Sequence, residues 1–214
     1  MYENRKDAGI KLSVPLKKIQ DEGKYTDPVV VSIPNGGVCI GIEIAKALNA
    51  PMDIILIKKI PALNNEELAI GSVSENGIVF LNNDLVEKFG VDENYIQEKG
   101  MEKIYEMEQI RNAYEYESVV LEGKDVILVD DGAATGVSMY LAAQSIAREM
   151  PRSVTIALPV APNDKKVLNM LKSVCHHLEI LYMPDNFMSI SKWYEDFHQL
   201  SDEEVKELLE KIKY

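Results

Sequence analysis

The chain has 214 residues, of which 46% are hydrophobic and 27% charged, and its formal net charge is −12. This length suits one α/β domain with a sizeable core, and the acidic excess argues against nucleic acid or an anionic membrane surface as the main partner. Two cysteines are too few for a disulfide framework, and we find neither a membrane span nor an apolar signal segment, so we expect a cytoplasmic location.

The first half of the chain predicts a strand, a helix, a second strand, a hairpin and a long charged helix, at residues 27–34, 37–48, 51–60, 69–82 and 92–114. The hairpin turn is expected at Asn76–Gly77. The stretch 61–83 is a candidate flap. The long helix is expected to bury an apolar stripe made of Met101, Ile104, Tyr105 and Ile110.

The second half continues the alternation. Strands are expected at 126–129, 153–162 and 177–184, and helices at 139–150, 164–173 and 201–214. Asp164 is the expected cap of its helix, and Ser201 with Glu204 forms a capping box at the last helix. Alternating strands and helices indicate an α/β fold with a mostly parallel sheet.

The stretch VILVDDGAATGVSM, residues 126–139, has the pattern of a functional loop. A buried strand ends at two adjacent carboxylates, Asp130 and Asp131, and a tight small-residue loop follows at 132–136. Adjacent carboxylates repel each other, so we expect something outside the fold to compensate them.

Ligands of open α/β sheets bind outside the carboxyl ends of the strands. A loop of glycine and alanine lets ligand oxygens approach backbone N–H groups, and the start of the next helix favours an anion such as phosphate. Thr135 and Ser138 add hydroxyl donors, while the Walker A ending is missing. The carboxylates would then face sugar hydroxyls or Mg²⁺.

This stretch resembles the phosphoribosyl pyrophosphate signature of type I phosphoribosyltransferases. The resemblance implies that Asp130 and Asp131 contact the ribose 2′- and 3′-hydroxyls. It implies a 5′-phosphate loop made of Gly132, Ala133, Ala134, Thr135, Gly136, Val137 and Ser138.

Further segments are similar to successive motifs of a bacterial and archaeal branch of this family whose acceptor is unassigned: NRKDAG, IPNGGV, EIAKALNAPMDIILIKKI, EELAIGSV, RNAYEY, ALPVAP and WYEDFHQLSDEEV. The similarity covers about residues 4–208. It implies the type I phosphoribosyltransferase fold in a single domain, 1–214. That fold has a mostly parallel central sheet, helices on both faces and a small hood, here from residues 1–20 and 185–214.

The resemblance places the pyrophosphate loop at Pro34–Gly37, where Asn35, Gly36 and Gly37 follow a strand. A plain strand-to-helix turn is the alternative. The branch leads us to expect Arg at position 35, so Asn35 removes a cation from the leaving group. Lys58 and Lys59 end a predicted strand and either bind pyrophosphate or lie in solvent.

Three other features leave alternatives open. Arg5 resembles an N-terminal arginine of the family and either reaches the site or lies exposed on a helix. Ala134 stands where enzymes for 6-oxopurines carry Asp, which disfavours hypoxanthine and guanine and leaves adenine or another base open. Trp193, Tyr194 and Phe197 either stack on a base or, as we favour, pack a terminal helix.

A metal site at Cys175-His176-His177 is disfavoured, because adjacent residues rarely ligate one ion. The resemblance implies Mg²⁺ as the cofactor, carried by the substrate and reached only indirectly by Asp130 and Asp131. It also implies phosphoribosyl transfer from phosphoribosyl pyrophosphate to a nitrogenous base, in a homodimer. The alternative is a non-catalytic sensor of phosphoribosyl pyrophosphate; a response-regulator-like domain would leave the loop at 132–136 unexplained.

Overall fold

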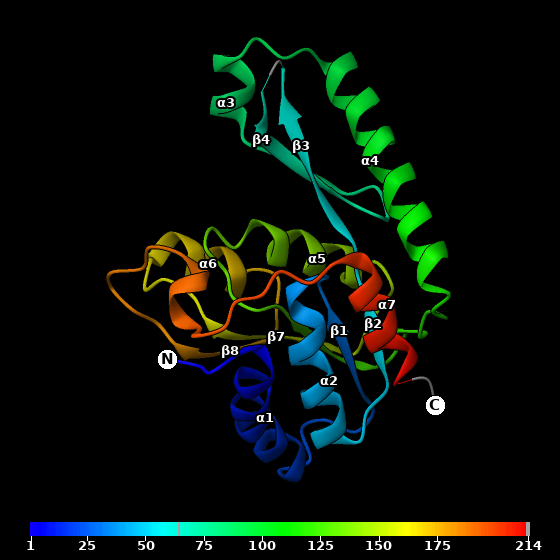
Figure 1. The fold of residues 1–214 in the computed structure, drawn as a ribbon, viewed down its shortest axis with the longest axis vertical. Helices are drawn as coiled ribbons and strands as arrows, with labels where there is room; N and C mark the ends of the chain where they lie inside the picture. Colours follow the sequence, from blue (N-terminus) through cyan, green and yellow to red (C-terminus); the bar gives the residue numbers. More distant parts are fainter. Residues whose placement is uncertain (64, 213–214) are drawn as a thin grey trace.

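The body of the protein is built on a parallel five-stranded sheet (Figure 1). The computed structural model describes residues 1–63 and 65–212. All four strand pairs of this sheet are parallel. In spatial order the strands are β2 (Met52–Ile54), β1 (Pro28–Ser32), β6 (Asp125–Val129), β7 (Ser153–Val160) and β8 (His177–Tyr182). The predicted α/β class with a mostly parallel sheet is confirmed.

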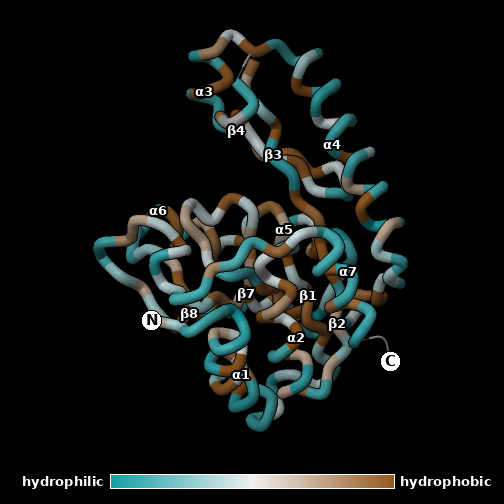
Figure 2. The backbone as a smooth tube through the Cα atoms, viewed as in Figure 1, coloured by the Kyte–Doolittle hydropathy of each residue, from teal (hydrophilic) through white to brown (hydrophobic). Residues whose placement is uncertain are grey.

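Helices cover both faces of this sheet, which explains why its central strands are continuous apolar runs. On β6, Ile127 and Val129 pack toward α1 (Arg5–Asp21) and α2 (Gly36–Leu48). The alternate residues, Val126 and Leu128, pack toward α5 (Val137–Ala147) and α6 (Lys165–Lys172). Figure 2 shows these hydrophobic stretches gathered in the body, with hydrophilic segments around it.

A second, antiparallel sheet projects from the body (Figure 1). We call it, with its two helices, the projecting unit. Its elements are β3 (Ile57–Ala62), β4 (Asn65–Ser74), β5 (Val79–Leu81), α3 (Asn83–Lys88) and α4 (Glu93–Tyr114).

The single strand predicted at 51–60 is wrong, because the chain changes sheets within it. At the break, the Ile55 N–H still donates to Ser32 O, whereas the Leu56 N–H donates to Glu75. Isoleucines recur through both halves of the stretch, so the pattern contains no signal for the exchange of partners. The hairpin is confirmed: Val73 pairs with Val79, and Gly77 has a left-handed φ of 76° in the turn.

The long helix is confirmed as α4, but half of its predicted apolar stripe is wrong. Met101 and Tyr105 are 71% and 63% exposed. Ile104 packs against the core, and Met107 and Tyr114 are buried in place of the exposed pair. The reason is that α4 runs along the projecting unit, so the narrow face it buries is set by that unit rather than by the main sheet.

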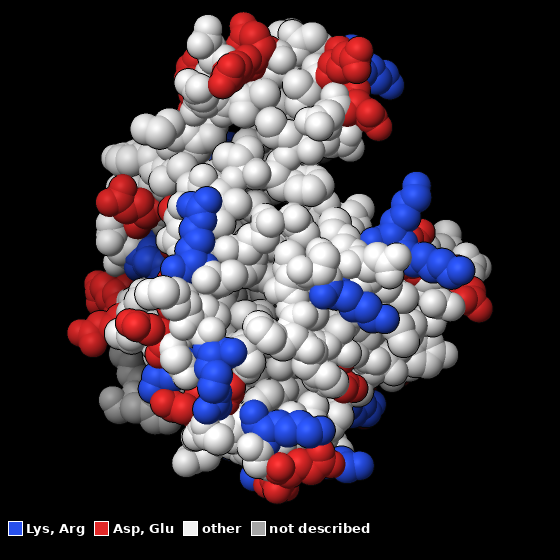
Figure 3. All heavy atoms as spheres, turned by 180° about the vertical axis from the view of Figure 1, so that it is seen from behind, with Lys and Arg blue, Asp and Glu red and all other residues white. Residues whose placement is uncertain are grey.

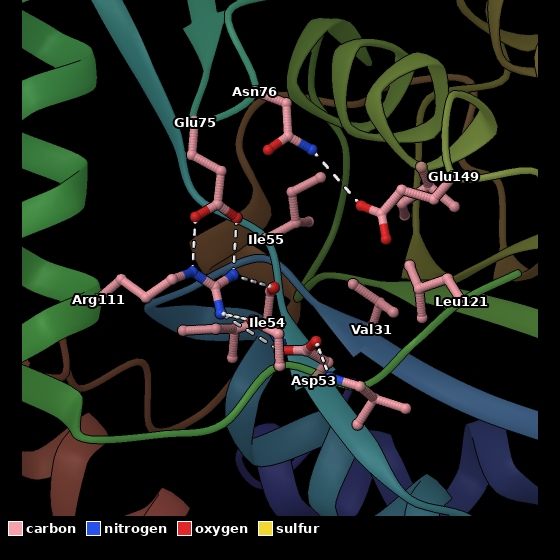
Figure 4. Close-up of a pocket in the computed structure, with 12 residues that line it drawn as sticks. Val31, Asp53, Ile54, Ile55, Glu75, Asn76, Arg111, Leu121 and Glu149 are labelled. Atoms are coloured by element: carbon pink, nitrogen blue, oxygen red, sulfur yellow. Dashed lines mark hydrogen bonds and ion pairs between the residues drawn. The ribbon is translucent and has the colours of Figure 1, made fainter.

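Arg111, on the last turn of α4, joins the projecting unit to the body (Figure 4). Its Nε and Nη2 each lie 2.7 Å from a carboxylate oxygen of Glu75, and Nη2 donates to Ile54 O at 2.7 Å. Its Nη1 lies 3.4 Å from Asp53 Oδ1. These residues and Glu149 line a cavity of about 190 Å³.

The C-terminal segment contains the short 3₁₀ helix η1 (Ile190–Trp193) and then α7 (Asp202–Glu210). The predicted capping box of Ser201 and Glu204 is confirmed, as is the Asp164 cap of α6. Residues 213–214 of the predicted tail helix lie outside the described residues. Within the described residues, none of the helices has the length and apolarity needed to cross a membrane.

Candidate functional site

Two loops meet at the carboxyl ends of neighbouring strands. Residues 35–37 follow β1, and residues 130–138 follow β6. The two strands pair in parallel with Ser32 opposite Val129, so both loops leave the sheet at the same edge. The predicted pyrophosphate loop and the predicted ribose and phosphate loop are therefore brought together.

The contact between these loops is so close that only glycine fits. A Cβ on Gly36 would lie 2.1 Å from Asp131 Oδ2, and a Cβ on Gly37 would lie 2.9 Å from Val129 O. Real Cβ atoms do not approach other atoms this closely. The two glycines thus let the acidic pair pack directly against the first turn of α2, which is more than a plain strand-to-helix turn requires.

Arg5 is buried, with 8% of its surface exposed, and it reaches the acidic pair. Its Nε and Nη2 both lie 2.8 Å from Asp131 Oδ2. The expectation that compensation for the carboxylates comes from outside the fold is therefore wrong for one of them, because α1 supplies a cation. The sequence left this open, since Arg5 and Asp131 are 126 positions apart.

The C-terminal segment encloses this ion pair. The Phe197 ring lies 4.0 Å from the Arg5 guanidinium carbon, and Arg5 Nη1 donates to His198 O. The Tyr194 hydroxyl donates to the backbone oxygen of Asp131 at 2.6 Å. Two of the three aromatic residues considered as a lid thus pack around the ion pair, which fits the packing alternative.

Trp193, the third aromatic residue, packs against Tyr182 with ring centroids 4.9 Å apart. Across the site, Ile190 lies against Gly132, where a Cβ would approach it to 3.0 Å. Part of the C-terminal segment assigned to the hood thus lies beside the end of β6. The division of the chain into one domain with a terminal hood stays a prediction.

The two carboxylates have different surroundings. Asp131 is buried, whereas Asp130 is partly exposed and accepts the Asp131 N–H at 2.8 Å. Burial raises the pKa of Asp130, and the neighbouring Asp131 raises it further. Burial also raises the pKa of Asp131, and the Arg5 guanidinium opposes that rise. Among the described residues, Asp131 is therefore the carboxylate that has a cation partner, and Asp130 has none.

The loop after the acidic pair presents the start of α5. Gly136 precedes the helix with a left-handed φ of 76°, and a Cβ there would approach Met170 to 2.9 Å. Ala134 and Thr135 are exposed, and Ser138 is partly exposed in the first turn. The N–H groups of a first turn have no partner within the helix, so this surface suits an anion.

A cleft of about 600 Å³ separates this helix start from the projecting unit. Thr135, Val137 and Ser138 line one side, and Lys59, Phe80 and Asn82 line the other. Figure 3 shows a hollow between the projecting unit and the body from behind. The sequence did not single out Phe80 or Asn82, because a hairpin considered as a flap gives no sign of what it faces.

The two predicted lysines do not act together, because neighbouring residues on a strand point to opposite faces. Lys59 faces the cleft, whereas Lys58 Nζ pairs with Glu106 of α4 at 2.8 Å. Both lie within β3, not at the end of a strand of the main sheet, which corrects the position predicted for them.

Asn35 holds the C-terminal segment. Its Nδ2 donates to Leu200 O at 2.7 Å and lies 3.4 Å from Asp202 Oδ1. The Tyr114 hydroxyl donates to the same Asp202 oxygen at 3.1 Å. The residue that stands in place of the expected Arg thus has a structural role of its own.

Exchanging Asn35 for Asp is expected to loosen this attachment. The change keeps the shape of the side chain but replaces a donor by an acceptor that faces Leu200 O and Asp202. The free energy of unfolding should fall by about 1–3 kcal/mol, as for a lost buried hydrogen bond. Urea unfolding measures the change. Asn94→Asp makes the same change at an exposed position and should be nearly neutral, so equal behaviour of the two variants would contradict this role.

The Cys175-His176-His177 stretch lies at the start of β8, an edge strand of the main sheet. The Val154 N–H donates to His176 Nδ1 at 3.0 Å, and His177 lies 3.3 Å from Glu179. Among residues 1–63 and 65–212, no group of three or more His, Cys, Asp or Glu could hold a metal ion.

Comparisons with known proteins agree with this geometry. A sequence model described as phosphoribosyl transferase domain matches residues 3–180. Two curated proteins, from the CDC 1551 and H37Rv strains of Mycobacterium tuberculosis and each named putative phosphoribosyl transferase, are 29% identical over 213 residues. The match covers 99% of this chain but 47% of theirs, so the chain spans about half the length of these relatives.

Among solved structures, that of TT1426 from Thermus thermophilus is 30% identical, with a TM-score of 0.79 and 99% of each chain covered. The family match spans both loops of the site and reaches from α1 into the last strand of the parallel sheet. The chain belongs to the phosphoribosyl transferase domain family and has the type I phosphoribosyltransferase fold.

Proposed function

We propose that the chain binds phosphoribosyl pyrophosphate together with Mg²⁺ and transfers the phosphoribosyl group to a nitrogenous base. The observation that carries this proposal is the meeting of two helix starts, those of α2 and α5, at one sheet edge with the acidic pair Asp130 and Asp131 between them. A ligand with phosphates at both ends and hydroxyls between them matches this order of anion sites and carboxylate.

Each part of the ligand has a proposed partner. The loop 132–138 and the start of α5 receive the 5′-phosphate, with Thr135 and Ser138 as hydroxyl donors. Asp130 accepts a hydrogen bond from a ribose hydroxyl, and the N–H groups of Asn35 and Gly36 face the pyrophosphate; the Gly37 N–H is bonded to Ile33 O. Lys59, on the wall of the cleft, is the cation we keep in the site. We leave Lys58 out because Glu106 holds it.

The proposed reaction breaks the bond between the ribose anomeric carbon and the pyrophosphate oxygen and forms a bond from that carbon to a base nitrogen. The electron pair of the broken bond leaves with pyrophosphate, and the proton of the base nitrogen goes to solvent. Positive charge grows on the sugar ring, as in glycoside cleavage. The carboxylate of Asp130 favours that charge, and the α2 amides favour the charge on the leaving group.

The donor set fits an ion that arrives with the ligand. Mg²⁺ prefers carboxylate oxygens and keeps several waters. Asp131 Oδ2 accepts two bonds from Arg5, and a guanidinium at this distance repels a second cation. Direct coordination by Asp131 is therefore unfavourable, whereas an ion on the pyrophosphate, near Asp130, meets no such obstacle. When bound, it would neutralise the leaving group.

A non-catalytic sensor of phosphoribosyl pyrophosphate is the second candidate. Asn35 stands where the branch leads us to expect a cation, and its amide is committed to Leu200 and Asp202. Ligand binding needs the helix starts and Asp130, whereas fast departure of pyrophosphate needs stabilisation of developing charge. The homodimer and the cytoplasmic location also stay predictions.

A screen of free bases distinguishes the two candidates. The protein is incubated with Mg²⁺, phosphoribosyl pyrophosphate and one base at a time, and pyrophosphate release is measured. A transferase releases pyrophosphate with at least one base and, because Ala134 lacks a carboxylate, does not use hypoxanthine or guanine. A sensor binds phosphoribosyl pyrophosphate without release. Absence of binding would contradict both functions.

Asp130→Asn is expected to weaken binding of phosphoribosyl pyrophosphate, because an amide places a donor where the ligand hydroxyl needs an acceptor. Loss of one charge-assisted bond costs about 1.5–3 kcal/mol, or roughly 10- to 150-fold in affinity. Titration calorimetry measures this. Asp21→Asn, an exposed change at the end of α1, is the control and should bind like the native protein. Native affinity in Asp130→Asn would remove this residue from the site.

Removal of Mg²⁺ is expected to abolish most of the binding. The ligand is a polyanion, the protein has a net charge of −12, and Asp130 is not paired with a cation in the described residues. Calorimetry with excess chelator should therefore show a loss of at least tenfold relative to buffer with Mg²⁺. Equal affinity in the two buffers would show that the ion is not part of ligand recognition.

A further inference from the structure

We propose that Arg5 is a positioning residue for the ribose site, which holds Asp131 in one orientation and leaves its second carboxylate oxygen to the ligand. This rests on the proposed function. Both bonds from Arg5 end on Oδ2. Within the described part of the chain, no hydrogen bond reaches Oδ1. A ribose hydroxyl could therefore donate to Oδ1 while Arg5 stays bonded to Oδ2.

All three guanidinium nitrogens are used. Nε and Nη2 contact Asp131, Nη1 contacts the carbonyl of His198, and Phe197 covers the face of the group. The planar guanidinium thus has a single orientation, set by the C-terminal segment. A lysine carries the same charge but has no fork and cannot satisfy these partners together.

Within the described residues, Arg5 is the group that bonds the carboxylate of Asp131. Gly36 lies directly against its Oδ2, and the Tyr194 hydroxyl holds its backbone oxygen. The ionisable groups around it include Asp130, which repels it, Tyr194, whose pKa is raised by burial and by Asp131, and Cys39 on α2, whose pKa is raised by burial. Arg5 is the cation that offsets both carboxylates, so its removal leaves Asp131 free to turn away from Asp130.

The consequence is that a sugar contact depends on residues far away in the sequence. Arg5 on α1, Asp131 after β6 and Phe197 in the C-terminal segment form one connected unit. A change at Arg5 or Phe197 should then act on ribose binding although neither contacts the ligand.

A double-mutant cycle tests this with ribose 5-phosphate as the probe, because this ligand has the sugar and the phosphate but no pyrophosphate. Arg5→Gln is expected to lower affinity at least tenfold by calorimetry. Asp131→Asn should do the same. The double variant should bind no more weakly than Asp131→Asn alone, because Arg5 acts through Asp131. Independent, additive losses would overturn the proposal.

Arg5→Lys separates orientation from charge. It keeps the positive charge, so long-range attraction of the ligand is preserved, but it loses the fork. We expect it to lose most of the affinity that Arg5→Gln loses, and Phe197→Leu to lose part of it. Native affinity in Arg5→Lys would show that charge alone matters and would overturn the proposal.

Arg152→Gln is the matched control. Arg152 pairs with Asp125 at the opposite end of the same strand, β6, so its removal disturbs a comparable pair away from the site. It should lower the unfolding temperature and leave affinity unchanged in the folded protein. If Arg5→Gln likewise loses stability but keeps its affinity, the role of Arg5 is contradicted and the proposed function is not. If the unmutated protein does not bind ribose 5-phosphate, and Asp130→Asn does not change binding of phosphoribosyl pyrophosphate, both the proposed function and the role of Arg5 are contradicted.

Discussion

Replacing Arg111 with methionine is expected to lower the free energy of unfolding by about 3–5 kcal/mol, the usual cost of breaking a buried ion pair from one side. The variant leaves Asp53 and Glu75 facing each other across the cavity in Figure 4 with no cation between them. It also removes the bond to Ile54 O, which ties α4 to the edge of the main sheet. Urea unfolding followed by circular dichroism measures the loss.

The stability loss of Arg111→Met is expected to depend on pH in a defined direction. Burial already raises the pKa of Asp53, and Arg111 opposes that rise, so removing Arg111 raises this pKa further. In the folded state of Arg111→Met, Asp53 then holds a proton at pH values where the unfolded chain has released it. The loss of stability relative to the unmutated protein should therefore shrink as the pH is lowered. Arg148→Met, at an exposed position at the end of α5, is the control and should change stability by less than about 0.5 kcal/mol. A deficit that is constant with pH would show that the loss comes from packing.

Gly36→Ala is expected to abolish binding of phosphoribosyl pyrophosphate while the fold is retained. The added methyl group would lie 2.1 Å from Asp131 Oδ2 and 3.0 Å from Arg5 Nε, so the ion pair must move. Overpacking of this kind costs about 1–3 kcal/mol in stability. The loss of binding should be larger than that of Asp130→Asn, because the change displaces Asp131 and also disturbs the first turn of α2.

Gly100→Ala is the matched control for this substitution. Apart from its chain neighbours and the nearby backbone of its own helix, nothing lies within 4 Å of a Cβ built on Gly100, which stands inside α4. Alanine should raise stability there by about 0.5–1 kcal/mol, because glycine weakens a helix, and affinity should not change. Calorimetry and urea unfolding on both variants test the pair. Normal binding by Gly36→Ala would mean that Asp131 need not keep its observed position.

The sequence alone was sufficient for strands β1, β6, β7 and β8, for helices α2, α5 and α6, and for the loop from Asp130 to Ser138. These features are local. A parallel strand buried on both faces has to be a continuous apolar run, and a loop that brings backbone close to a ligand needs small residues. The same holds for the caps at Asp164 and Ser201, whose partners lie within three residues.

Only the tertiary structure decided how that loop is completed. Arg5 and Asp131 are 126 positions apart, and Asn35 and Leu200 are 165 positions apart, so no local pattern pairs them. Alternation along β3 puts Lys58 and Lys59 on opposite faces, but only the fold shows that Lys58 meets Glu106 of α4 and that Lys59 faces the cleft. Composition and spacing describe what a segment can bury or bind, whereas the partner of a buried charge depends on which distant segment the fold brings to it.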